Sequence, residues 1–77
     1  MLKGVRTLRY SGVHRAYAIY HGWPDWAIAR VSYQKQDGTP VVVHFVQRHE
    51  MKAYLDELLT KEDERIKYVE AEEIIWG

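Results

Sequence analysis

The sequence contains no cysteine, only two prolines and only five glycines among its 77 residues. Without cysteine the chain can form neither disulfides nor thiolate metal sites, which favours a reducing compartment. The glycines are scattered, so no glycine-rich loop is present to hold a phosphate group. No apolar stretch approaches the roughly 20 residues of a membrane-spanning helix, and no apolar leader segment follows Met1. We therefore expect a cytoplasmic protein that makes no contact with a membrane.

The length of the chain predicts one small α+β domain spanning residues 1–77. A chain of this size buries roughly 60–65% of the surface that its unfolded form exposes. It therefore needs nearly all of its large apolar residues in the core. No internal repeat, linker or low-complexity segment interrupts the sequence.

The formal net charge is zero, but the charges are distributed unevenly. Residues 1–35 contain six basic residues and one acidic residue, whereas residues 36–77 contain five basic and ten acidic residues. Such asymmetry is found where one face binds an anionic partner, and equally where two halves of a fold attract each other. An acidic row can also imitate a nucleic-acid backbone, but basic residues interrupt this one.

Three strands are predicted in the first half of the chain. Residues 2–10 alternate loosely between apolar and polar, and residues 13–20 are rich in β-branched and aromatic types. Ser11-Gly12 would form the turn between these two strands. A third strand is expected over residues 26–35.

The segment from Gln36 to Thr39 carries the strongest local signal in the sequence. Asp37-Gly38 tolerates the positive φ angles of a tight hairpin turn, and Pro40 can begin the strand that follows. Residues 41–46, VVVHFV, are nearly all strand formers. We expect this strand at the centre of the sheet or covered on both faces.

The apolar period changes over residues 48–60, which predicts an amphipathic helix. Its stripe consists of residues three and four positions apart: Met51, Tyr54, Leu55, Leu58 and Leu59. Residues 66–76 are predicted to form a strand, with a second helix as the alternative. Their glutamates are typical of an edge strand, where charge prevents unwanted pairing.

The expected order of elements is therefore β-β-β-β-α-β in an α+β fold. The first four strands would form a four-stranded antiparallel meander, with one amphipathic helix packed on one face and a C-terminal edge strand. The other face of the sheet would stay uncovered, so we expect function there.

No set of residues predicts catalysis or metal binding. The four histidines do not have the spacing of a zinc-binding helix, and no serine or threonine lies in a nucleophile motif. We therefore expect no enzymatic activity, no catalytic residues, no metal, no cofactor and no small-molecule substrate.

Tryptophan, tyrosine and arginine are the residues most enriched in binding hot spots. The predicted partner-binding residues are Trp23, Trp26, Tyr20, Arg15 and Arg30. The two tryptophans could instead fill the core, Trp26 more readily than Trp23. The sequence thus favours a non-catalytic interaction module, of inhibitor or adaptor type, that binds another protein or a second copy of itself as a homodimer.

The alternative function is binding of single-stranded DNA or RNA. Arginine and tyrosine interleaved on the first three strands could follow a phosphate backbone and stack on bases. The residues proposed for this role are Arg6, Arg9, Tyr10, Arg15, Tyr20 and Tyr33. The zero net charge of the chain weakens this alternative, because it limits long-range attraction to phosphate.

Overall fold

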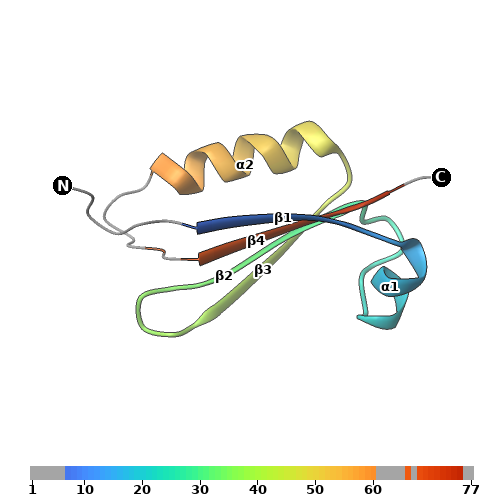
Figure 1. The fold of residues 1–77 in the computed structure, drawn as a ribbon, viewed down its shortest axis with the longest axis horizontal. Helices are drawn as coiled ribbons and strands as arrows, with labels where there is room; N and C mark the ends of the chain where they lie inside the picture. The colour runs from blue at the N-terminus through green and yellow to red at the C-terminus, as the bar shows by residue number, and fades with distance from the viewer. Residues whose placement is uncertain (1–6, 61–65, 67, 76–77) are drawn as a thin grey trace.

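A long helix lies along one face of a four-stranded sheet, and a short helix lies at one end of the other face (Figure 1). The computed structural model describes residues 7–60, 66 and 68–75. In chain order the elements are β1 (Thr7–Val13), α1 (Arg15–Tyr20), β2 (Ala29–Gln34), β3 (Pro40–Phe45), α2 (Arg48–Thr60) and β4 (Tyr68–Ile74). The predicted α+β class is confirmed.

The sheet is mixed, so the predicted antiparallel meander is wrong. Its strand order is β1-β4-β2-β3, with β1 parallel to β4 and the other two pairs antiparallel. Among the described strands, only β2 and β3 are joined as a hairpin. The element order therefore differs from the prediction, because one predicted strand is the helix α1.

The C-terminal strand β4 lies in the centre of the sheet, which corrects the prediction of an edge strand. Val69 and Ala71 are buried on the face that carries α2, and Glu70 and Glu72 alternate onto the opposite face. That opposite face, called the open face below, leaves these carboxylates half-buried. Glutamates fit a central strand here because only one face of the strand needs to be apolar.

The predicted strand over residues 13–20 is wrong, because residues 15–20 form α1. The predicted turn at Ser11-Gly12 is also absent: β1 continues through both residues to Val13. The side chain of Ile75 lies over Gly12, where an added Cβ would be 2.6 Å from the Ile75 Cγ2 atom. Gly12 therefore allows close packing inside a strand and does not form a turn.

The hairpin and the long helix agree with the sequence. Gly38 has a φ of 91°, and the backbone N–H of Thr39 donates to the Asp37 carboxylate at 2.9 Å. The helix α2 covers the predicted residues 48–60. However, β3 is an edge strand, and the expectation that residues 41–46 lie centrally or covered on both faces is wrong.

Several predicted strand residues, 2–6, 67 and 76, lie outside the described residues. The third strand begins at Ala29 rather than at residue 26, because the preceding residues form a turn.

Two apolar clusters stabilise the sheet from opposite faces. The larger one packs the α2 stripe of Met51, Leu55 and Leu58 onto β2 and β4. The smaller one lies at the α1 end of the open face and consists of Val13, Ala18, Trp23, Ala27 and Ile74. Among the described residues, the open face is thus covered only at that end (Figure 1). Neither helix in the described part of the chain is long and apolar enough to cross a membrane.

Candidate functional site

The end of α1 is fixed by two backbone hydrogen bonds that place Trp23. The N–H of Gly22 donates to the Ile19 carbonyl at 3.1 Å, and the N–H of Trp23 donates to the Ala18 carbonyl at 2.9 Å. Gly22 has a φ of 78°, a conformation that glycine adopts without strain. This is the Schellman arrangement, in which the residue after the glycine packs back on the helix. Trp23 accordingly lies against Ala18 in the smaller cluster.

A second turn follows immediately and orients the other tryptophan outward. The N–H of Ala27 donates to the Pro24 carbonyl at 3.0 Å, so Trp26 occupies the third position of a β-turn. Trp26 is 55% exposed, whereas Trp23 is 6% exposed. Trp23 is therefore a core residue, and its prediction as a partner contact is corrected. Trp26, for which the core was the favoured alternative, is on the surface.

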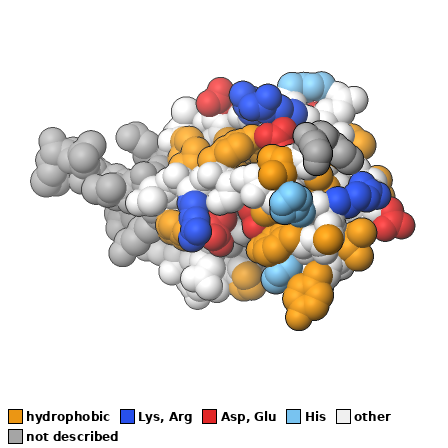
Figure 2. All heavy atoms as spheres, turned by 45° about the vertical axis from the view of Figure 1, so that its right-hand side comes forward, with side chains coloured by type: hydrophobic (Ala, Val, Ile, Leu, Met, Phe, Trp, Pro, Cys, Tyr) orange, Lys and Arg blue, Asp and Glu red, His pale blue; other side chains and the backbone are white. Residues whose placement is uncertain are grey.

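The helix α1 exposes nearly all of its large side chains. Among its six residues only Ala18 is buried, while Tyr17, Ile19 and Tyr20 are 40%, 62% and 85% exposed. These three residues and Trp26 are called the α1 surface below. In Figure 2, where this end of the molecule comes forward, hydrophobic side chains gather there with histidines between them.

Ring contacts order the α1 surface. The His21 ring lies 4.1 Å from the Tyr17 ring and 5.3 Å from the Tyr20 ring, centre to centre. Residues 14–28 contain only two charged side chains, Arg15 and Asp25, and both are exposed. The surface is therefore aromatic and poor in charge.

His44 of β3 connects the two tryptophans. Its ring centre lies 5.8 Å from that of Trp23 and 6.3 Å from that of Trp26, edge-on in both cases. Burial, and then the nearby charge of Arg30, lower the pKa of His44 below its ordinary value of 6.5. The Nε2 atom of His44 and the Nε1 atom of Trp23 are buried without a hydrogen-bond partner among the described residues.

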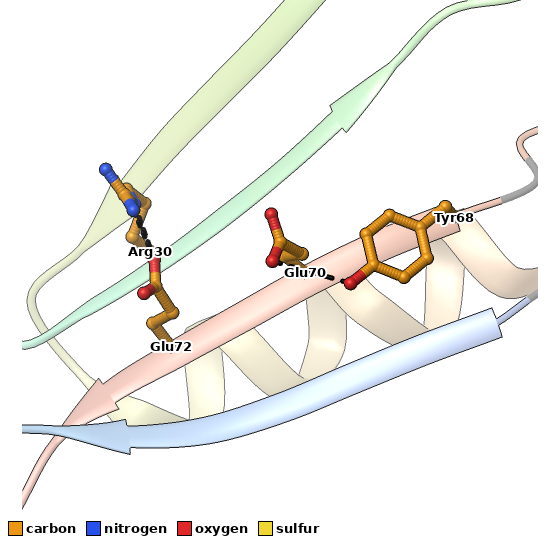
Figure 3. A network of polar contacts seen from close by, with 4 residues as sticks. All are labelled: Arg30, Tyr68, Glu70 and Glu72. Carbon is orange, nitrogen blue, oxygen red and sulfur yellow. Dashed lines mark hydrogen bonds and ion pairs between the residues drawn. The ribbon is translucent and has the colours of Figure 1, made fainter.

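Arg30, a predicted partner-binding residue, is engaged within the molecule. Its Nε atom donates to the Glu72 carboxylate at 2.9 Å, and its Nη2 atom also pairs with that carboxylate (Figure 3). Its guanidinium carbon lies 5.2 Å from the centre of the Trp23 ring, a cation–π geometry. Arg30 therefore supports Trp23 inside the fold, and its role in partner binding stays a prediction.

The residues proposed for nucleic-acid binding lie on different faces of the sheet. Arg9 lies on the open face beside Tyr68 and Glu70, whose contacts raise the pKa of the guanidinium. Tyr10 lies on the α2 face and donates a hydrogen bond to the Glu73 carboxylate; burial, and then this bond, raise its pKa. Tyr33, half-buried, packs against the α2 cluster, and Arg6 lies outside the described residues.

The open face also holds a depression of about 630 Å³ at the end far from α1. Its lining includes Ser32, Gln34, Val42 and Glu70, and the Tyr68 hydroxyl approaches the Glu70 carboxylate at 3.5 Å (Figure 3). Within the described residues, no three histidine, aspartate or glutamate side chains come together as a metal site.

Sequence reasoning missed Tyr17, Ile19 and His44 as members of the site. The available signal was Gly22, which follows a run containing Ala16 and Ala18 and can end a helix as well as a strand. Comparisons of the chain with protein-family models, with curated proteins and with solved structures find no match.

Proposed function

We propose that the protein is a non-catalytic interaction module that binds another protein through the α1 surface. The observation that carries the proposal is the exposure of Tyr17, Ile19, Tyr20 and Trp26 around a helix that buries only Ala18. A chain of this size needs its apolar residues for a core, yet ten large ones are exposed among the described residues, and four of them belong to the α1 surface.

The composition of the surface fits a binding hot spot. Tyrosine and tryptophan contribute large contact areas with few rotatable bonds, and interface cores are depleted in charge. The α1 surface has both properties, with Arg15 and Asp25 as the charged residues nearest in sequence. We therefore expect a partner whose contact area is apolar at its centre and polar at its rim.

The α1 surface is already ordered in the free protein. The Schellman arrangement fixes the end of α1, and buried Trp23 anchors the following turn beneath Arg30 and His44. A surface that is already ordered loses less conformational entropy on binding, so more of the contact energy appears as affinity.

The nucleic-acid alternative has less support. Arg9 and Tyr10 face opposite sides of the sheet, and Tyr10 is hydrogen-bonded to Glu73. Because β4 is central, Glu70 and Glu72 also lie along the open face, where carboxylates would repel a phosphate backbone.

The proposal is tested by affinity capture with a variant that carries both Ile19→Gln and Tyr20→Gln. Glutamine is a good helix former, so the changes remove apolar contact area without breaking α1. We expect proteins captured by the wild-type chain from extracts of its source cells to be lost from the variant. Their direct binding, measured by calorimetry with the purified partner, should weaken at least tenfold.

The matched control is Tyr68→Gln, which removes an exposed aromatic side chain at the end of the sheet far from α1. The control should capture the same proteins as the wild-type chain. Identical capture by all three proteins would refute the α1 surface as the binding site.

A further inference from the structure

The edge strand β3 has no charged side chain. It reads Pro40–Phe45, PVVVHF, and pairs only with β2 among the described strands. Edge strands of monomeric proteins are normally protected from pairing by charge, proline, bulges or short length, and of these β3 has a proline, Pro40, at its first residue. The other edge, β1, carries Arg9, whereas Val42 of β3 is 53% exposed. The edge at β3 is thus the one open to further strand pairing.

The three valines of β3 make this edge complementary to itself. When two identical strands pair antiparallel about a two-fold axis, side chains directly opposite each other lie on the same face of the sheet. With the axis at Val42, each Val42 faces the other copy's Val42, and Val41 faces Val43 in both directions. Three successive positions then pair valine with valine, and no charges meet.

The two-fold axis fixes how the remaining elements of the two copies are arranged. The axis is normal to the sheet, so both α2 helices lie on the same face of an eight-stranded sheet. In each copy α2 packs over β2 and β4 and also contacts the edge strand through the rings of Phe45 and Tyr54, 5.4 Å apart. The zero net charge of the chain adds no long-range repulsion between copies.

The same arrangement gives Trp26 a contact across the axis. His44 lies opposite the other copy's Pro40 in this register, and both lie on the open face. Trp26 contacts His44 edge-on on that face and projects into solvent. Its exposed ring is therefore positioned to cover the proline ring of the other copy.

We propose that two copies of this chain form a dimer by antiparallel pairing of their β3 edges, with Val42 opposite Val42. The interface shares Trp26 with the α1 surface but none of the side chains of α1, and it does not depend on the partner proposed above. Five paired residues a side, Pro40 to His44, make a small interface, so we expect a dissociation constant in the micromolar range.

A single cysteine tests the register, because the chain has none of its own. Directly opposite residues of antiparallel strands have Cα atoms about 4.5–5.5 Å apart, which is within the range of a disulfide. Under mild oxidation, Val42→Cys should form a disulfide-linked dimer many times faster than Gln34→Cys, an exposed position at the end of β2. Preferential linking of Val43→Cys to itself would contradict the register.

Sedimentation at several concentrations tests the dimer itself. The wild-type chain should pass from monomer to dimer in the micromolar range, and Val42→Lys should weaken the dimer at least tenfold by placing two ammonium groups at the axis. Gln34→Lys is the control and should keep the dimer. A wild-type chain that stays monomeric at several hundred micromolar would overturn the proposal, and so would equal cross-linking of both cysteine variants.

The variant that carries Ile19→Gln and Tyr20→Gln separates the two proposals. It should dimerise like the wild-type chain while losing its partner, and Val42→Lys should do the reverse. If Val42→Lys fails to fold by circular dichroism, cross-linking of Val42→Cys still decides, because cysteine keeps a small apolar side chain on the strand.

Discussion

Trp23 and Trp26 lie three positions apart but should respond differently to truncation. Trp23→Ala removes a buried indole from the smaller cluster, and such changes cost about 3–5 kcal/mol. Trp26→Ala removes a side chain that is 55% exposed and should cost about 1 kcal/mol or less. Urea unfolding measures both free energies, and equal losses would contradict the assignment of one tryptophan to the core.

His44 makes the stability of the fold depend on pH. Burial lowers its pKa in the folded chain, so the unfolded chain binds a proton more readily. The contribution of neutral His44 is therefore complete above its ordinary pKa of 6.5 and is lost as the pH falls below it. We expect His44→Phe, which keeps an aromatic ring between the tryptophans, to reduce this loss.

Unfolding free energies at pH 7.5 and pH 5.5 measure the effect. At pH 7.5 the His44→Phe variant should be about as stable as the wild-type chain. The change removes the buried Nε2 atom of His44, which has no hydrogen-bond partner among the described residues, and it keeps an aromatic ring in the same place. His49→Phe, at an exposed position of α2, is the matched control for replacing a histidine by phenylalanine. An unchanged loss in His44→Phe would assign the acid sensitivity to other groups.

Which of the two tryptophans is buried could not be predicted from residue type. Their placement depends on the Schellman arrangement at Gly22, which requires that the preceding residues be helical. Because residues 13–20 were predicted to form a strand, Gly22 was not recognised as the glycine that ends a helix.

At the scale of elements, Gly12 lets the Ile75 side chain pack closely over β1. Gly12→Ala would place a Cβ 2.6 Å from the Ile75 Cγ2 atom, and overpacking of this kind costs about 1–3 kcal/mol. Ile75→Ala should relieve the clash, so the double variant should lose less stability than the sum of the single variants. A double-mutant cycle by urea unfolding measures the coupling, and strict additivity would contradict the contact.

Local signals predicted the elements whose residues interact with near neighbours. The hairpin at Asp37-Gly38 depends on its own turn residues, and α2 depends on a stripe within one segment. The helix α1 was missed because Tyr17, Ile19 and Tyr20 have high strand propensity, which the surrounding structure overrides.

At the scale of the whole molecule, the α+β class and a sheet face left largely open were predictable, but the strand order was not. The parallel pairing of β1 with β4 joins residues about 60 positions apart, which no local pattern reports. Glutamates in β4 indicated an edge strand, although an open face lets a central strand carry them.

The same long-range pairing also engages residues that the sequence predicted as binding sites. Inserting β4 between β1 and β2 brought Glu72 to Arg30 and Glu73 to Tyr10, so two predicted binding residues have partners inside the fold. The α1 surface remains because only Ala18 of α1 packs into the cluster that contains Ile74 of β4, while Tyr17, Ile19 and Tyr20 stay exposed.

The most direct test of the account is the unfolding free energy of the variant that carries Ile19→Gln and Tyr20→Gln. If these large side chains serve binding and not folding, urea unfolding should give a free energy within about 1 kcal/mol of the wild-type value, while partner binding is lost. A loss of about 3 kcal/mol or more, with partner binding retained by the fraction that stays folded, would make α1 a buried element and contradict the account.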